Sequence, residues 1–441
     1  MAENPAAQAA QRETIPPHYR WNAPIFAIES ALFFIAMNFI SSTTVMPGLI
    51  MQLSGSEVIV GLAGGLQSGA WLLPQLLVAS ATSRMREKKP VIVRVAWPGR
   101  TIFWWAALGL LLLGRDRPTL TLILVITSIV TFFAIDAVIS VPWFDLMAKC
   151  IPPRSRGKIM GLPQVAGGLV GIGVGAFVRY ALSDQGWAFP LNYAIIFAAA
   201  STILMLSAFF LTLIREPPAN GTPKEEMPSL KRILAMLPQI MVEDKPFLRL
   251  VIARVVSGFV MVASAFYVLH ATENLGLGQE TTGLFVSAQV SGSLVAGLLT
   301  SIVQDRFGPL AHIRVVNLIA ALPPIIALAA QPFAAALGPA VLYVYLLVFF
   351  MLGLYAGSSG WPFFNWILEY ADEFKRPLYI GIVNTFGALN MVAPLLGGWV
   401  ARTISYPAAF ALALGFALVT LLLTRTLPCT RKTATAAAEG I

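Results

Sequence analysis

A carboxylate inside a long apolar run is the first candidate for chemistry in this chain. Asp136 lies in the stretch TFFAIDAVIS, about ten residues from the polar end of its run. At a rise of ~1.5 Å per residue, a helix would place this acid near the middle of a bilayer. An acid at that depth needs partners or water. It can bind a cationic group or carry a proton, or it can be a structural acid that is hydrogen-bonded between helices.

Two more charged residues lie within apolar runs. Glu29 and Arg254 each sit about two helical turns in from the polar end of their runs. They can pair with each other across the molecule, or each side chain can extend separately to the membrane surface. Uncharged polar residues are further candidates to contact a substrate, although some must face lipid or other helices: Asn38, Tyr267, Tyr355 and Asn365.

Residue types for other chemistry are scattered or missing. The three histidines and two cysteines show no zinc-binding spacing. The glycines of GIGVG lie within an apolar run, with no strand before them and no lysine after them, so they do not form a nucleotide-binding loop. We therefore predict no metal, no cofactor and no enzymatic activity.

The overall composition indicates a membrane protein. Of the 441 residues, 57% are hydrophobic and only 12% are charged, whereas soluble domains carry about 25% charged residues. The formal net charge is +9, but the basic residues lie in short loops between apolar runs rather than on one soluble face. The lipid bilayer is therefore the expected partner, and nucleic acid is not.

Apolar runs of about 20 residues mark helices that span a membrane. The sequence predicts an all-α membrane protein with twelve transmembrane helices, an even number that puts both termini on one side. The predicted runs are 24–49, 58–82, 91–114, 118–147, 158–183, 189–214, 247–271, 280–303, 310–331, 338–368, 377–403 and 407–428.

The distribution of Lys and Arg predicts which side the termini occupy. All but four of the 30 Lys and Arg residues fall on the face that carries the termini, and Arg100 is counted among the loop charges of that face. The four exceptions are Arg115, Arg117, Arg179 and Arg402. Because cytoplasmic loops are rich in Lys and Arg, we expect a multi-pass protein with both termini in the cytoplasm.

A polar segment rich in proline and charge divides the twelve runs six and six. The two sets are expected to form pseudo-symmetric six-helix bundles. The predicted regions are an N-terminal cytoplasmic tail 1–22, an N-terminal bundle 23–214, a cytoplasmic linker 215–245, a C-terminal bundle 246–428 and a C-terminal cytoplasmic tail 429–441.

The two halves repeat one another in sequence. The stretch PWFDLMAKCIPPRSRGKIMG (142–161) aligns without a gap on PFFNWILEYADEFKRPLYIG (362–381). Within this alignment, Arg156 matches Arg376. Duplicated six-helix halves are typical of transporters in which two similar bundles rock around a shared site at the membrane midplane.

The two copies of this joint differ in charge. The first is basic, through Lys149, Arg154, Arg156 and Lys158. The second is acidic, through Glu369, Asp372 and Glu373. The joints can attract each other when an inner gate closes, or their charges can serve only to orient the chain in the membrane.

The loop after the eighth run carries a signature. It reads DRFG at residues 305–308, and a degraded copy in the first half, ATSRMREKKPV, keeps the base as Arg84. This loop, the twelve runs and the six-plus-six repeat resemble the major facilitator superfamily over nearly the whole chain. The stretches RWN at 20–22 and LLPQLLVA at 72–79 resemble a poorly characterised bacterial branch of it.

The resemblance implies a secondary transporter that works by alternating access. We expect a monomer in the bacterial inner (plasma) membrane that moves an unknown small molecule, with protons as the candidate coupling ion. Helices 1, 4, 7 and 10 line the cavity in that fold, which would place Asp136 beside it. Glu29 and Arg254 can pair across the two halves when the inner gate is shut, or each can extend separately to the membrane surface. The alternative is a membrane sensor or receptor that binds a ligand without moving it.

The resemblance also implies gate and packing residues. The signature loop would latch neighbouring helices in one state of the gate, and a solvated turn is the alternative. The residues assigned to the cytoplasmic gate and loop motif are Asp305, Arg306, Gly308, Arg84, Asp145, Arg156 and Arg376. Glycines at a spacing of four would let helix 2 slide on helix 11 and helix 5 on helix 8: Gly61, Gly65, Gly69, Gly167, Gly171 and Gly175.

Overall fold

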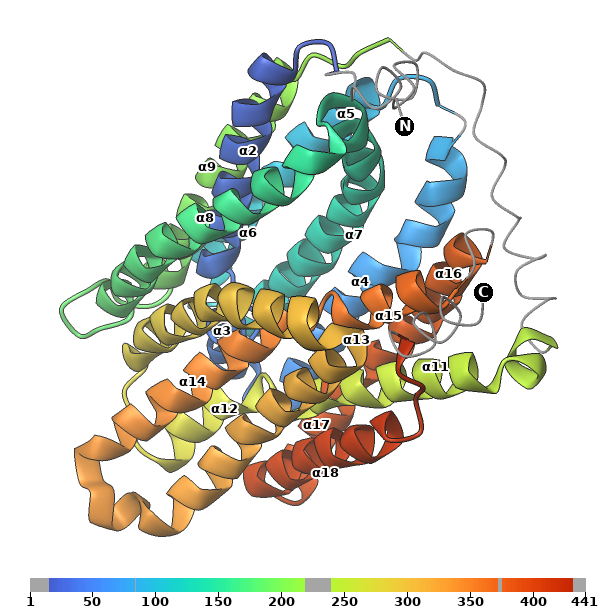
Figure 1. Ribbon diagram of the computed structural model, residues 1–441. Coiled ribbons are helices and arrows are strands. Elements are labelled where there is room, and N and C mark those ends of the chain that lie inside the picture. Colours follow the sequence, from blue (N-terminus) through green and yellow to red (C-terminus); the bar gives the residue numbers. More distant parts are fainter. Residues whose placement is uncertain (1–15, 84, 219–238, 372–374, 431–441) are drawn as a thin grey trace, which may run out of the picture.

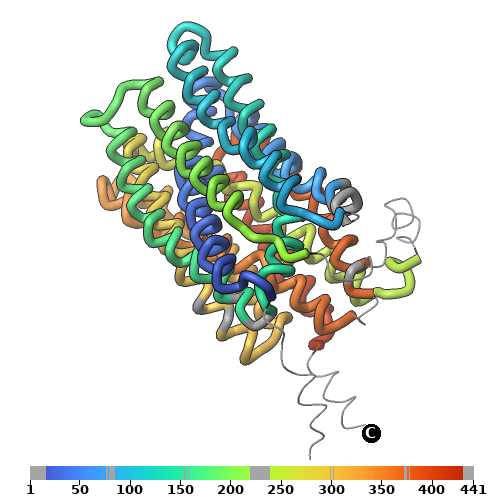
Figure 2. Tube along the Cα trace, turned by 90° about the horizontal axis from the view of Figure 1, so that it is seen from above, coloured from blue at the N-terminus to red at the C-terminus, as the bar shows by residue number. Residues whose placement is uncertain are grey.

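The computed structural model describes residues 16–83, 85–218, 239–371 and 375–430, and the elements in these residues are all helices. They form two bundles, coloured blue to green and yellow to red in Figure 1. We call the helices up to α9 the N-half and those from α11 onward the C-half. Figure 2 shows the N-half in front of the C-half, with the helices of both running in roughly the same direction.

The N-half follows the predicted runs closely. Its helices are α2 (Tyr19–Phe39), α3 (Val45–Ser54), α4 (Glu57–Ser83), α5 (Lys89–Arg100), α6 (Ile102–Leu113), α7 (Pro118–Cys150), α8 (Pro153–Ala181) and α9 (Leu191–Leu213). Two pairs of helices, α2 with α3 and α5 with α6, each correspond to one predicted run.

The C-half follows the same plan with more interruptions. Its elements are α11 (Lys245–Gly258), η1 (Phe259–Ala263), α12 (Phe266–Leu269), η2 (His270–Asn274), α13 (Thr281–Leu337), η3 (Gly338–Ala340), α14 (Val341–Ser358), α15 (Pro362–Tyr370), α16 (Arg376–Gly387), η4 (Ala388–Met391), α17 (Val392–Thr403) and α18 (Tyr406–Thr424).

The prediction of an all-helical membrane protein is confirmed. Nine helical stretches of the described residues are long and apolar enough to cross a membrane. One of them, Ile302–Tyr370, is 69 residues long and covers two predicted runs, 310–331 and 338–368. With α4 and the first part of α13, the chain has the twelve predicted helices.

The first predicted run, 24–49, is not one continuous helix, which corrects the prediction. α2 and α3 are separated by a short break that contains the run SSTT. There the hydroxyl groups of Ser41 and Thr43 lie 3.1 Å apart, and Thr43 donates to the side chain of Gln289 in the C-half at 2.7 Å. The hydroxyl groups in the break therefore bond to one another and to the C-half.

Gly308 divides α13 into two spanning segments. Its φ of 82° and ψ of 178° lie in a region of backbone space that is essentially restricted to glycine. The turn falls at the end of the sequence DRFG. The glycine of this signature therefore has a conformational role that is independent of any latch.

The helices define two faces. The linker face carries the C-terminal end of α9 and the N-terminal end of α11, and the opposite face carries the loops after α6 and α8. Near the linker face Asn22 of α2 exchanges two hydrogen bonds with the backbone of Arg215, both 2.8 Å long, just beyond the end of α9. The spanning region thus begins at the face where the first bundle ends.

The apolar cores reveal how the halves meet. One core joins both halves, for example Phe39 and Met46 with Phe266 and Phe285. Toward the linker face the cores are separate. One contains only N-half residues, such as Met147, and another contains only C-half residues. The two halves are therefore packed together near the opposite face and separated near the linker face.

We predict that Gly308→Ala lowers the free energy of unfolding by about 1–3 kcal/mol, because alanine is strained at this backbone conformation. Gly297→Ala in the same element is the control, since Gly297 has open space around it and a helical backbone. The control should be neutral or stabilising by up to ~1 kcal/mol. Equal melting temperatures for the two variants in detergent would contradict the conformational role.

Candidate functional site between the two halves

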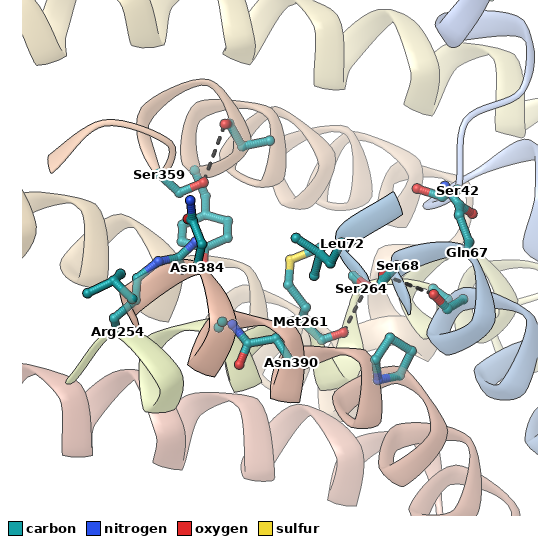
Figure 3. A pocket seen from close by; sticks show the side chains of 18 residues that line it. Ser42, Gln67, Ser68, Leu72, Arg254, Met261, Ser264, Ser359, Asn384 and Asn390 are labelled. Atoms are coloured by element: carbon teal, nitrogen blue, oxygen red, sulfur yellow. Dashed lines mark hydrogen bonds between the residues drawn. The ribbon is translucent and has the colours of Figure 1, made fainter. Parts of the chain in front are cut away.

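A cavity of about 350 Å³ lies between the two halves (Figure 3). Nine of the 18 residues that line it carry polar side chains. They are Ser42, Gln67, Ser68, Arg254, Ser264, Tyr355, Ser359, Asn384 and Asn390. Polar side chains within spanning helices are tolerated where they face one another, water or a ligand, so this cavity is the first candidate site.

Glycines of α4 close the cavity on one side. Gly61, Gly65 and Gly69 face η4 and α17 of the C-half, and a methyl group on either of the first two would overlap a backbone carbonyl oxygen. Gln67 and Ser68, which lie between Gly65 and Gly69 along α4, line the cavity. Because α4 runs from the opposite face to the linker face, the contact at Gly61 separates the cavity from the opposite face.

The glycine stripe of α8 is divided between two neighbours. Gly175 packs against Ser287 of α13, which is the contact of helices 5 and 8 that the resemblance implies. Gly171 lies between Asn38 of α2 and α13, and Gly167 faces α2 inside the N-half. Sliding along these stripes stays a prediction.

Polar contacts reinforce the closed side. Besides the bond from Thr43 to Gln289, Ser287 donates to the carbonyl oxygen of Ile172 at 3.0 Å. Glu57, the first residue of α4, forms an ion pair with Arg402 of α17 at 3.5 Å. Each of these contacts joins the N-half to the C-half near the opposite face.

Arg254 is the charged residue of the cavity. It lies nine residues into the span that begins at Lys245, or ~14 Å from the start of the helix. Its guanidinium carbon is 5.4 Å from the ring centroid of Phe363, and Figure 3 shows it beside Asn384. Among the described residues that line the cavity there is no carboxylate. The cavity therefore carries a positive charge of its own.

The amide groups of α16 and η4 were not among the predicted site residues. Asn384 and Asn390 line the cavity, and the Oδ1 atom of Asn390 is buried without a hydrogen-bond partner in the described part of the chain. The Asn390 amide packs directly against Gly258 of α11. The sequence held a signal for these two residues, because both are amides inside the apolar run 377–403 and amides in a spanning helix need partners.

The uncharged candidates are only partly brought together. Tyr355 lines the cavity, and its hydroxyl donates to the carbonyl oxygen of Ser257 at 3.4 Å. Tyr267 instead stacks on a phenylalanine inside the C-half. Asn38 donates to a backbone carbonyl of its own helix at 3.0 Å. Neither Tyr267, Asn38 nor Asn365 is among the cavity-lining residues in the described structure.

Asp136 lies inside the N-half and does not line this cavity. It is 9% exposed and lies 3.6 Å from the guanidinium group of Arg100. Arg100 is 3% exposed and sits over the ring of Phe33, with 4.7 Å from its guanidinium carbon to the ring centroid. Counting Arg100 as a loop charge was therefore wrong, because the helix carries it into the spanning region.

Glu29 belongs to the same buried cluster. Its carboxylate accepts hydrogen bonds from Ser207 at 3.0 Å and from the indole of Trp143 at 3.2 Å, and it interacts electrostatically with both Arg100 and Asp136. It is 4% exposed, so it does not extend to the membrane surface as one alternative held. In this state Glu29 is held inside the N-half while Arg254 lines the cavity, and their pairing in a closed gate stays a prediction.

A second polar network holds the linker face of the N-half. The Glu216 carboxylate accepts the backbone N–H groups of Lys88 and Lys89 at the start of α5, at 2.9 and 2.8 Å. It also accepts the Lys149 ammonium at 2.7 Å, and Lys88 lies 3.8 Å from Asp145. A carboxylate at a helix N-terminus is favourable. The network therefore attaches the start of the linker to α5 and α7.

The duplicated arginines make equivalent contacts. Arg156 donates its Nε hydrogen to the carbonyl oxygen of Ile151 at 3.1 Å, and Arg376 does the same to Ala371 at 3.0 Å. Both members of each contact correspond in the alignment of the two joints. Each arginine satisfies a carbonyl just beyond the C-terminal end of a helix, where a positive charge is also favourable.

The remaining gate residues lie on the linker face. Asp305 and Arg306 are exposed at the end of the first segment of α13, before Gly308. Arg84 and, in the acidic joint, Asp372 and Glu373 lie outside the described residues. Attraction between the joints and a latch in the signature loop stay predictions.

Comparisons with known proteins indicate one family. The family model described as Major Facilitator Superfamily matches residues 28–390 and 250–440. No curated protein sequence matches the chain.

Solved structures share the fold at low sequence identity. A mutant of the nucleoside transporter NupG is 12% identical with a TM-score of 0.68, covering 91% of this chain and 98% of that one. XylE from E. coli, a xylose transporter in a partially occluded inward-open conformation, is 16% identical with a TM-score of 0.63, covering 93% and 100%. A POT family transporter in complex with 5-aminolevulinic acid is 11% identical with a TM-score of 0.63, covering 91% and 94%.

We predict that Arg100→Gln lowers the free energy of unfolding by about 3–5 kcal/mol, because it leaves two buried carboxylates without their cation. Arg94→Gln is the control on the same helix, since Arg94 is exposed. Neutralising the carboxylates as well, with Glu29→Gln and Asp136→Asn, should recover most of the loss. Equal melting temperatures for Arg100→Gln and Arg94→Gln would show that the cluster is not a stabilising unit.

Proposed function

Because the chain belongs to the major facilitator superfamily, whose members are multi-pass membrane transporters rather than enzymes, we propose that it carries a small molecule across the membrane by alternating access. The observation that supports this most directly is the cavity between the halves. A shared core closes it on one side, while the halves have separate cores on the other. Rocking of the halves would open the shared core and bring the separate ones together.

The proposed moving bodies are the regions 23–214 and 246–428, with 215–245 as the linker and 1–22 and 429–441 as tails. One chain supplies the cavity-lining residues of both halves, which supports a monomer as the working unit. The Lys and Arg distribution supports a cytoplasmic linker face in the bacterial inner membrane. In that orientation the state described here is accessible from the cytoplasm.

The Glu29–Arg100–Asp136 cluster is the proposed site of proton coupling. With both acids ionised, the cluster carries one net negative charge inside the spanning region. Uptake of one proton would neutralise it, and buried clusters of ionisable groups in transporters commonly serve as proton relays. The Nε and Nη1 atoms of Arg100 are buried without hydrogen-bond partners in the described residues, so the cluster has spare donors for a rearrangement.

We predict substrate-dependent pH changes inside liposomes that contain the purified protein and a pH-sensitive dye. Asp136→Asn should abolish the pH change, because the carboxylate that takes up the proton is gone. Asp184→Asn is the control, since Asp184 is exposed in the loop after α8. Normal coupling in Asp136→Asn would exclude the proton role, and ligand binding without flux would favour a sensor or receptor.

We predict opposite labelling of two introduced cysteines in a background where Cys150 and Cys429 are serine. In intact cells, an impermeant maleimide should label Asp184→Cys, and Lys158→Cys should be labelled only in inverted vesicles. Both parent residues are exposed, on opposite faces. The reverse pattern would contradict a cytoplasmic linker face.

A further inference from the structure

We propose that the substrate is a small organic anion that carries hydroxyl groups, bound with its negative group on Arg254 and a hydroxyl on Asn390. This inference rests on the proposed function, because it names the substrate class of the same cavity. It depends on the charge, depth and polar lining of that cavity.

The charge of the cavity favours an anion. Arg254 contacts the ring of Phe363, and no carboxylate among the described cavity-lining residues offsets its charge. The buried carboxylates Glu29 and Asp136 belong to the cluster with Arg100 inside the N-half. A cation would therefore meet like charge in the cavity, whereas a carboxylate or phosphate would supply a counter-charge that no described cavity-lining residue provides.

The depth of Arg254 makes this charge significant. The backbone of Arg254 lies ~14 Å from the start of its helix, which places this residue inside a hydrocarbon layer that is about 30 Å thick. A base at this depth is costly unless it has a partner or faces water, and it is a functional candidate by default. Guanidinium groups bind carboxylates and phosphates through two parallel hydrogen bonds.

A second polar group lies one helical turn away. Gly258 follows Arg254 by four positions, so both face the same side of α11, and the Asn390 amide packs against Gly258. Positions four apart on a helix are separated by about 6 Å. Asn390 lines the cavity, and a side-chain amide can both donate and accept hydrogen bonds. A molecule with an acidic group and a hydroxyl separated by one helical turn would satisfy both residues.

The rest of the cavity limits size and polarity. A volume of about 350 Å³ is near the lower end for ligand pockets, which favours a metabolite-sized molecule. Seven other polar side chains line the cavity, among them Gln67, Asn384 and Ser359, and all are uncharged donors and acceptors suited to hydroxyls. These groups favour a hydroxylated acid over a purely apolar anion.

The test is a thermal-shift screen of the purified full-length protein with matched probes that differ in charge. The triplets are gluconate, gluconamide and glucamine; 4-hydroxybenzoate, 4-hydroxybenzamide and 4-hydroxybenzylamine; and lactate, lactamide and 1-amino-2-propanol. We expect the acid of at least one triplet to raise the melting temperature more than its amide and amine. A screen in which the amides or amines stabilise best, or in which no acid stabilises, overturns the inference.

Variants then locate the anion. Arg254→Gln should weaken binding of the stabilising acid by about tenfold to a hundredfold, the range for hydrogen bonds to charged groups. Arg254→Lys should retain part of the affinity because it keeps the charge. Arg249→Gln is the control, since Arg249 is exposed on the same helix. Unchanged affinity in Arg254→Gln overturns the assignment.

Asn390→Leu tests the hydroxyl contact, because leucine keeps a similar volume without the amide. It should weaken binding of the hydroxy acid but not of the corresponding acid without that hydroxyl. Equal losses for both would overturn the role of Asn390.

Liposome flux separates this inference from the proposed function. Uptake of a neutral or cationic compound would support the proposed transport and overturn the anion as substrate. Arg254-dependent binding of an acid without uptake would support the anion and overturn transport.

Discussion

The cost of placing charge inside a membrane governs how this chain arranges its polar groups. Arg100, Glu29 and Asp136 satisfy this constraint together, as a closed cluster inside the N-half. Arg254 faces the same constraint but lines a cavity that has no carboxylate among its described residues. The first group of charges thus has opposite charges within the protein, and Arg254 is left to water or a ligand. This difference is the basis for proposing the cluster as a coupling site and the cavity as a binding site.

Close approach of the backbone determines where the two halves meet. Glycines of α4 and α8 bring the helices of the two halves into contact near the opposite face, where a single apolar core spans both. Near the linker face each half has a core of its own. The arrangement leaves the cavity on the linker side of the contact. In alternating access, the contact near the opposite face would open and the two halves would come together near the linker face.

The duplication supplied a scaffold that the two halves use differently. The contacts of Arg156 and Arg376 are equivalent, so the end of the helix before each joint is stabilised in the same way. The ionisable groups are not equivalent. When the alignment of the joints is extended backwards without a gap, Asp136 corresponds to Ala356, which lines the cavity in the C-half. The fold was repeated, whereas the charges that would couple and bind were placed in one half each.

The sequence by itself determined the twelve helices, the repeat and the family, because hydropathy and residue spacing are local properties. It also identified Asp136, Glu29 and Arg254 as charges that need an explanation. Only the tertiary structure decided which charges meet, since partners depend on how helices rotate and pack. From the sequence Arg100 was counted as a loop charge, but in the structure it lies at the end of α5 beside Asp136. Asn390 became a site residue only because η4 lies against α11, far away in the sequence.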